Sequence, residues 1–451
     1  MLKQFAFALV GGAMGLQLGC ATKMVDEAAG PPSQALPDAW AVSTNANAQA
    51  ARTDERWWML FGDPVLDQLI TEALTNSPDI AVAASRIVEA QAQAGIARSD
   101  QLPGLSLRAG ADRTQSSQRG SFPLPPGTPL IQNTFRATLE TSYELDLWGR
   151  YRSATAAARS ELLATQEAYQ TVRLSLIAST IEQYFNLLAA DAQVDVLQRT
   201  LAARGETLQL FNTRMAAGVS SEFNLFQAQA EEAAARAQLA NVKGRREQTD
   251  ATLAVLVGRS PRDVISGTVQ RGTPGALPNA WIPSGLPSEL LLRRPDIREA
   301  EHRLRAANAR ISNVRAAMFP SISLTAFLGS ESTELSDLFS GPAGIFQFAL
   351  GIAQPLFNGG RTGHGLTRAQ AQRDVALAQY KKAVANAFRD VRNALAAQDS
   401  ARQVLEAESQ RATALQQAHR HALLRLEGGV ANRLEVLDVE RQLLQAQIAQ
   451  I

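Results

Sequence analysis

The sequence is poor in cysteine, aromatic residues and net charge, and each shortage excludes a class of protein. Cys20 is the only cysteine, so a framework of intramolecular disulfides is impossible. Aromatic residues make up 6% of the 451 residues, and the formal net charge is +1. Basic residues do not gather on one segment or interleave with aromatic ones, so the composition gives no reason to expect a nucleic-acid partner.

Long apolar runs are missing as well. After Cys20 the chain has no uninterrupted apolar run of about 20 residues, the length that a helix needs to cross a bilayer. A membrane-spanning helix is therefore not expected. If the mature chain crosses a bilayer, it must do so with strands, because only helices and closed barrels satisfy their backbone groups in lipid.

The motifs of catalysis are also absent. The chain has no Walker or GxGxxG pattern, no nucleophile elbow and no pair of carboxylates at catalytic spacing. The histidines have no metal-ligand spacing, and we interpret them as solvated residues on helix faces. They are His302, His364, His419 and His421. A glycine-rich segment predicts a turn between a strand and a helix, and it comprises Gly359, Gly360, Gly363 and Gly365. The sequence predicts a protein that is not an enzyme and that needs no cofactor or metal.

The N-terminus has the pattern of an export signal. Residues 1–19 combine a positively charged start with an apolar stretch, and they end just before Cys20. This resembles a lipobox, which implies cleavage before Cys20 and lipid attachment to it, although Gln17 stands where such boxes usually have Leu. An ordinary signal-peptidase site is the alternative. Residues 20–51 are rich in Ala, Pro, Ser and Asn and predict an extended tether behind the lipid anchor.

The rest of the chain contains one duplicated unit. Pro78-Asp79-Ile80 recurs as Pro295-Asp296-Ile297, an offset of 217 positions. Seven further residues are identical to the residue 217 positions later in the chain. They are Arg86, Ala90, Ala92, Arg98, Pro103, Ser106 and Leu107. Chance similarity of alanine-rich helices is the alternative, but it would not preserve Pro at a fixed offset. We predict two structural repeats, residues 52–275 and residues 276–451, the second with an apparently short C-terminus.

Mainly apolar and polar residues alternate strictly between Phe135 and Asp146. This alternation predicts a strand with one mainly apolar face and one polar face. The charged residues of its polar face are Arg136, Glu140, Glu144 and Asp146. This pattern is typical of a barrel strand with lipid on one side and a water-filled lumen on the other. An edge strand of a soluble sheet is the alternative. Residues 105–111 are expected to pair with it across a loop at 112–133.

The second repeat has a similar pair of alternating segments, residues 322–328 and 346–352, around a polar loop. Four strands cannot close a barrel, and each unpaired backbone group in lipid costs several kcal/mol. Oligomers are therefore required, and three copies would give a barrel of twelve strands. Trp148 and Phe357 follow the predicted strands, either as aromatic residues at the membrane interface or as core residues of the junction.

A very long helix follows each strand pair. Residues 150–217 contain no Pro and one Gly, and residues 366–427 contain neither. At roughly 1.5 Å per residue, these helices would be about 100 and 93 Å long. Leucine, isoleucine and tyrosine recur at alternating spacings of 3 and 4, as in a coiled coil, at Leu174, Ile177, Ile181, Tyr184 and Leu188.

Both long helices are expected to reverse at a hairpin tip. Gly218-Val219 and Gly429-Val430 place glycine where a helix ends in the left-handed conformation, and a new helix follows each. The two tips also share an arginine, because Arg214 recurs 211 positions later as Arg425. We therefore predict two helical hairpins, one in each repeat.

Several short motifs join this plan of strands and helices to a known family. They are Trp57-Trp58, Asp63-Pro64, the run Leu286-Pro287-Ser288-Glu289-Leu290-Leu291-Leu292-Arg293-Arg294-Pro295-Asp296-Ile297, and Leu434-Glu435-Val436-Leu437-Asp438. With the duplicated plan, they resemble the TolC-type outer-membrane efflux family, in particular its lipoprotein branch typified by OprM and NodT. The resemblance extends over essentially the whole mature chain.

The resemblance implies a mixed α and β membrane protein. In this fold a trimeric, 12-stranded outer-membrane β-barrel is continuous with a long periplasmic α-helical barrel. It implies a homotrimer that carries cargo passively, without a cofactor, from the periplasm through the outer membrane. The energy would come from an inner-membrane pump of the resistance-nodulation-division type. A periplasmic adaptor protein would link pump and channel by docking on the hairpin tips at Gly218, Val219, Gly429 and Val430.

The resemblance also implies a gate at the periplasmic end. By motif position, Leu434, Glu435 and Asp438 match it, and their spacing of three or four places them on one helical face. Threefold symmetry would turn each acid into a ring of three, which favours cations. We expect Arg425 to pair with an acid in the closed state. Solvated polar positions on a helix are the alternative. The equivalent places in the first repeat hold Phe223, Asn224 and Gln227.

Two other functions remain open from the sequence. The chain could be the outer-membrane exit duct of a protein secretion system, which the identity of a co-purifying adaptor would reveal. It could also be a non-conducting structural lipoprotein of the envelope. The acidic face of the strand at Glu140 and Glu144 argues against this second reading, because a bridge between envelope layers needs no water-lined barrel. The cargo of a channel is not determined by the sequence.

Overall fold

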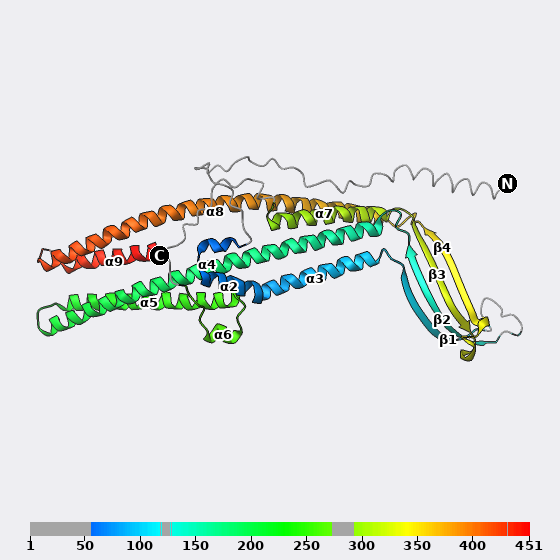
Figure 1. Cartoon of the computed structure of the whole chain (residues 1–451), viewed down its shortest axis with the longest axis horizontal. Helices are drawn as coiled ribbons and strands as arrows, with labels where there is room; N and C mark the ends of the chain where they lie inside the picture. Colours follow the sequence, from blue (N-terminus) through cyan, green and yellow to red (C-terminus); the bar gives the residue numbers. More distant parts are fainter. Residues whose placement is uncertain (1–55, 118, 120–126, 128, 273–292, 431) are drawn as a thin grey trace. The chain divides into compact units, whose positions relative to one another are not determined.

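The computed structural model describes residues 56–117, 119, 127, 129–272, 293–430 and 432–451 (Figure 1). The predicted signal peptide at 1–19, the lipid-attachment residue Cys20, the tether at 20–51 and the start of the run from Leu286 lie outside these residues. The helices are η1 (Trp57–Phe61), α2 (Pro64–Asn76), α3 (Pro78–Ser99), α4 (Arg150–Ala216), α5 (Glu222–Leu256), α6 (Pro261–Ser266), α7 (Pro295–Ala316), η3 (Leu335–Asp337), η4 (Gly341–Ala343), α8 (Arg361–Glu427) and α9 (Arg433–Gln450). The strands are β1 (Gly104–Gln115), β2 (Ile131–Glu144), β3 (Ser321–Ser332) and β4 (Gly344–Ala353).

The order of elements repeats along the chain. The series α3, β1, β2, α4 and α5 is followed by α7, β3, β4, α8 and α9. The contacts nevertheless divide the chain into two compact units, and each draws on both series. Of the described residues, one unit takes those within Arg86–Glu167 and Pro295–Ala383. The other takes those within 56–85, Ala168–Arg294 and Val384–Ile451. None of the helices in the described ranges combines the length and apolar character needed to cross a membrane.

The first unit contains a four-stranded antiparallel sheet in the order β1-β2-β3-β4 (Figure 1). Its strands are longer than the sequence predicted. Asp112 and Thr114 still pair with Thr134 and Gln132, so the predicted loop at 112–133 was too long. Backbone groups make this ladder, and polar side chains at a strand end do not stop it.

The register gives the sheet one apolar and one polar face. On the apolar face Leu139 lies opposite Leu107 and Leu328, and Leu324 lies opposite Leu350. This face is open in the single chain, because Leu107 is 77% exposed and Phe346 82% exposed. An exposed apolar surface of this kind indicates a membrane or a partner. β1 and β4 pair on one side only within the described sheet, so each presents an open edge.

The end of β2 differs from the prediction. β2 stops at Glu144, and Asp146 instead caps α4 by accepting hydrogen bonds from the backbone N–H groups of Tyr151 at 3.2 Å and Arg152 at 2.8 Å. The same junction decides the role of Trp148. Its Nε1 donates to the carbonyl of Pro320 at 2.7 Å, so Trp148 is a packed junction residue.

Phe357, which the sequence grouped with Trp148, is 91% exposed. The two aromatic residues therefore have different surroundings although each follows a strand. Trp148 stacks on Phe319 with ring centroids 4.9 Å apart. Phe357 makes no comparable ring contact with the described residues.

The long helices are close to the prediction. α4 and α8 have 67 residues each. α8 begins at Arg361, ahead of the predicted start at 366, so Gly363 and Gly365 lie inside the helix and not in the turn. Gly359 and Gly360 make the turn alone, with φ of 63° and 82°. Each glycine inside a helix costs only about 1 kcal/mol, which the rest of a long helix offsets.

The second unit has its main core where α2 packs against α4 and α5. The fully buried residues of this core include Leu66, Ile70, Ile177, Tyr184, Leu187 and Leu253. Asp63 caps α2 by accepting from Val65 N at 2.8 Å, and its other carboxylate oxygen accepts a hydrogen bond from the Tyr184 hydroxyl. Burial and this hydrogen bond raise the pKa of Tyr184 to about 12, so the hydroxyl keeps its proton as a donor.

Candidate functional site

The two predicted hairpin tips have the same backbone geometry. Gly218 and Gly429 have φ of 73° and 72°. After each glycine a valine N–H returns to the helix: Val219 donates to the carbonyl of Arg214, and Val430 to that of Arg425, both at 2.9 Å. These bonds satisfy carbonyls at the helix end, and the positive φ explains the glycines. The tips lie where the sequence placed them, and their role in docking remains a prediction.

The predicted gate residues lie together around the second tip. Arg425 Nε is 3.4 Å from Glu435 Oε1, so the expected ion pair forms within one chain. Asn432 caps α9 by accepting from Glu435 N at 3.1 Å. Asp438 instead pairs with the next turn of its own helix, 2.6 Å from Arg441 Nη2. Each acid of the predicted gate therefore has a guanidinium partner.

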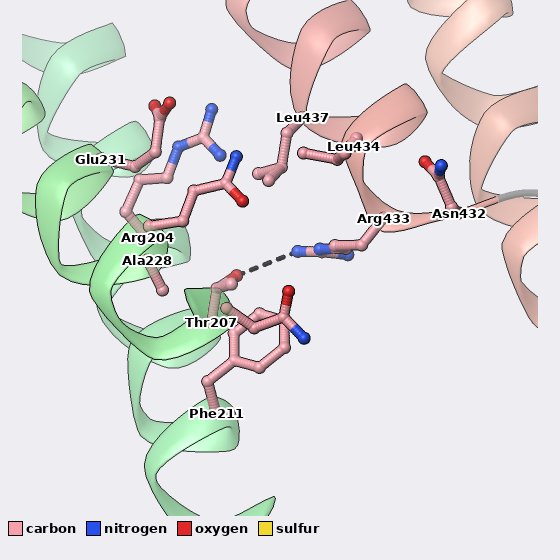
Figure 2. A pocket seen from close by; sticks show the side chains of 11 residues that line it. Arg204, Thr207, Phe211, Ala228, Glu231, Asn432, Arg433, Leu434 and Leu437 are labelled. Carbon is pink, nitrogen blue, oxygen red and sulfur yellow. Dashed lines mark hydrogen bonds between the residues drawn. The ribbon is translucent and has the colours of Figure 1, made fainter. Parts of the chain in front are cut away.

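A cavity of about 240 Å³ lies beside these residues, between the α4–α5 hairpin and the start of α9 (Figure 2). Leu434 and Leu437 line it from α9, and Phe211 lines it from α4. Arg433 Nη2 donates to Thr207 Oγ1 at 3.1 Å, shown as a dashed line in Figure 2. Leu434 thus borders a cavity inside the chain and is also 49% exposed.

A network that the sequence analysis missed connects the two hairpins. Arg204 on α4 is only 6% exposed, and its Nη1 lies 2.9 Å from Glu440 Oε2 on α9. The other oxygen of Glu440 lies 3.1 Å from His419 Nε2 on α8. This network brings side chains of both repeats together in the second unit. Because Arg204 is buried, removing its partner would leave a charge without compensation.

The sequence did contain a signal for Arg204. The residues Leu197, Leu201, Arg204, Leu208 and Phe211 follow each other at spacings of 4, 3, 4 and 3. That is the spacing of core positions in a coiled coil, and an arginine at such a position needs an acidic partner on a facing helix. The pattern could have identified Arg204 but not Glu440 as its partner.

The charged residues predicted for the barrel lumen are also paired. Glu140 Oε2 lies 3.7 Å from Arg108 Nε, Arg136 Nη1 lies 3.6 Å from Glu331 Oε2, and Glu144 Oε2 lies 2.8 Å from Arg150 Nη2. The register places Arg136, Glu140 and Glu144 on the polar face of the sheet, where they were predicted. Asp146 lies beyond the sheet as the cap of α4, so its assignment to the strand was wrong.

The prediction of solvated histidines was wrong for two of the four. His419 contacts Glu440, and His302 on α7 is half-buried, with an Nδ1 that has no hydrogen-bond partner among the described residues. Burial lowers the pKa of His302, and the neighbouring Arg305 lowers it further. His364 and His421 are exposed, as predicted. Within the described ranges, no group of three His, Cys, Asp or Glu could hold a metal ion.

A sheet with one open apolar face, joined to helices of 67 residues, defines a class of outer-membrane protein with mixed strands and long helices. The outer membrane efflux protein family matches residues 69–259 and 286–451. The chain belongs to this family, so the predicted TolC-type resemblance is confirmed.

Individual proteins that resemble this chain in sequence or structure are outer-membrane proteins of efflux systems or outer-membrane channels. The chain is 36% identical over 406 residues to the toluene efflux pump outer membrane protein TtgF of Pseudomonas putida, covering 90% of this chain and 83% of that one. It is 33% identical over 414 residues to the cation efflux system protein CusC of Escherichia coli, covering 91% and 88%. The CmeC outer membrane channel of Campylobacter jejuni superposes with a TM-score of 0.87 at 26% identity, covering 93% and 90%.

These similarities confirm the mixed α and β membrane fold and the outer-membrane location. The chain is an outer-membrane component of an efflux system, and it extends into the periplasm. The family and the relatives are channel proteins, not enzymes.

Proposed function

We propose that three copies of this chain form a closed channel that exports small molecules passively. Each copy supplies four strands, and β4 of one copy pairs with β1 of the next to close a barrel of twelve. An inner-membrane pump of the resistance-nodulation-division type delivers the cargo through a periplasmic adaptor. The adaptor docks on the tips at Gly218, Val219, Gly429 and Val430, and a lipid on Cys20 anchors the chain to the outer membrane.

The open sheet supports this proposal most directly. Its apolar face is exposed and its polar face carries charged residues, so lipid on one side and water on the other would satisfy both. The open edges of β1 and β4 cannot remain unpaired in lipid, and pairing between copies removes them. When the β4 edge of each copy pairs with the β1 edge of the next, the identical chains form a closed ring.

The second tip supplies the gate in this proposal. Leu434, Glu435 and Asp438 narrow the periplasmic end, and the ion pair of Arg425 with Glu435 helps to hold the closed state. Both partners are about half exposed, so the pair contributes at most about 1 kcal/mol per chain and can be broken readily. The names of the relatives, a toluene and a cation efflux protein, support small molecules as the cargo.

Single-channel conductance in planar bilayers tests the proposal. The purified protein is measured beside a variant with Glu435→Ala and Asp438→Ala, and its oligomeric state is determined by light scattering in detergent. We expect a trimer with small, rare openings that become larger and more frequent in the variant, because the narrowing side chains and the ion pair are gone.

The first tip offers a matched control. A variant with Asn224→Ala and Gln227→Ala changes the equivalent positions of the first repeat and should leave the openings rare. Trimeric protein without discrete conductance in any form would refute the channel and favour the structural lipoprotein. Co-purification of the adaptor of a one-step protein exporter would favour the secretion duct.

A further inference from the structure

The charges on the polar face of the sheet form cross-strand pairs. Arg108 on β1 lies 3.7 Å from Glu140 on β2, and Arg136 on β2 lies 3.6 Å from Glu331 on β3. Arg136 and Glu331 are direct partners in the strand register. Each pair contains one positive and one negative side chain from neighbouring strands, so the formal charges of the two pairs cancel.

Further contacts hold these side chains in place. The Arg136 guanidinium lies 4.7 Å above the centre of the Phe327 ring, in cation–π geometry. Thr138 Oγ1 donates to Glu140 Oε1 at 3.1 Å, and Thr138 is only 1% exposed. Arg108, Arg136, Glu140 and Phe327 line one hollow of this face, together with Gln347. The pairs therefore lie side by side on one surface.

We propose that Arg108 and Arg136 are specificity-determining residues that keep the strand section of the channel from selecting cargo by charge. The inference rests on the proposed function, in which this face lines the lumen. A ring of unpaired acids would attract cations and repel anions. A paired acid and arginine act together as a dipole, whose field falls off faster than that of a single charge and is further screened beyond a Debye length of about 10 Å at 0.1 M salt.

In a trimer, any unpaired charge in one chain occurs three times around the lumen. With both arginines neutralised, Glu140 and Glu331 would leave six uncompensated acids in a trimer. With both acids neutralised, the arginines would leave six uncompensated cations. Neither the sheet's apolar face nor the hairpin tips change in these variants, so a difference in ion selectivity reports the strand section.

The experiment measures the reversal potential of the channel in a roughly tenfold gradient of potassium chloride. The Arg108→Gln, Arg136→Gln variant should shift it toward the potassium equilibrium potential. The Glu140→Gln, Glu331→Gln variant should shift it toward that of chloride. Neutralising all four residues should return it close to the parent value. Arg113→Gln, on the opposite face of β1, should leave it unchanged.

Trimer formation is checked for every variant by light scattering. If a double variant does not assemble, Arg108→Gln and Glu140→Gln alone test the same idea, with smaller shifts of the same opposite signs. Shifts that are absent, or that have the same sign in both, would overturn the inference while leaving the channel intact. A trimeric parent that does not conduct would instead refute the proposed function.

Discussion

The two hairpin tips have nearly the same backbone and different side chains. Gly218 and Gly429 have φ values within one degree, and the same backbone hydrogen bond follows each. The first tip leads into α5 without a side-chain cap, whereas Asn432 caps α9 and Glu435 pairs with Arg425. Duplication preserved the residues that determine the backbone turn. At the two acidic gate positions, however, the second tip has Glu435 and Asp438 where the first has Asn224 and Gln227.

The helices before the strands differ in a similar way. α3 and α7 both begin with Pro-Asp-Ile and have 22 residues each. At equivalent positions Ser85 is exposed on α3, whereas His302 is half-buried on α7. α7 buries more of its residues than α3, so the copies share a shape but not their surroundings.

The link between the two hairpins should show the largest effect. Arg204→Met is expected to lower the free energy of unfolding by about 2–3 kcal/mol, because Glu440, whose side chain is only 26% exposed, loses its arginine partner. Thermal and urea unfolding followed by circular dichroism would measure this change.

A double variant with Glu440→Gln should recover part of the loss, because it removes the uncompensated charge. Arg214→Met, at an exposed position of the same helix, should stay within about 0.5 kcal/mol of the parent. Equal effects of Arg204→Met and Arg214→Met would show that the network is not a stabilising link.

The tip glycines should show an intermediate and equal effect. Gly218→Ala and Gly429→Ala should each cost about 1–2 kcal/mol, because an L-residue in the left-handed conformation is strained. No atom lies within 4 Å of the position that a Cβ would take at either glycine, so crowding adds nothing. Urea unfolding of both variants under the same conditions would test this. Costs that differ by more than about 1 kcal/mol would contradict the equivalence of the tips.

The smallest expected effect concerns pH and His302. Burial and Arg305 lower its pKa below the ordinary value of 6.5, while Glu301 and Glu167 oppose this. The unfolded chain therefore binds the proton first, so the stability contributed by neutral His302 is lost as pH falls from about 6.5 through the folded pKa. His302→Ser, which introduces the residue found at position 85, should flatten this part of the pH dependence. The measurement compares melting temperatures at pH about 7.5 and about 5.5. A pH dependence equal in parent and variant would count against His302 as its source.

Local patterns in the sequence predicted much of the fold. Strict alternation indicated the strands, and the long stretches without proline indicated α4 and α8. Prediction was weakest at the ends of elements. Asp112 extends β1, and Asp146 leaves the strand to cap a helix, because backbone pairing at an end depends on the facing chain.

The site was predicted unevenly for the same reason. The residues of the second tip and the gate could be found because they are neighbours in sequence, all within the segment from Arg425 to Asp438. Arg204 and Glu440 are separated by more than two hundred positions, so nothing in the local spacing could pair them. The ion pairs of Glu140 and Glu331 with arginines could not be predicted either, because the strand register brings these side chains together.

The sequence by itself determined the duplicated plan, the glycine tips, the two-faced strands and the family. Each depends on local periodicity or on backbone conformations that few residues adopt. Only the tertiary structure decided which charges meet. Ion pairing depends on distances of a few ångströms between side chains of different elements, and those distances follow from strand register and helix packing. The acids that looked unopposed in the sequence therefore have arginine partners in the folded chain.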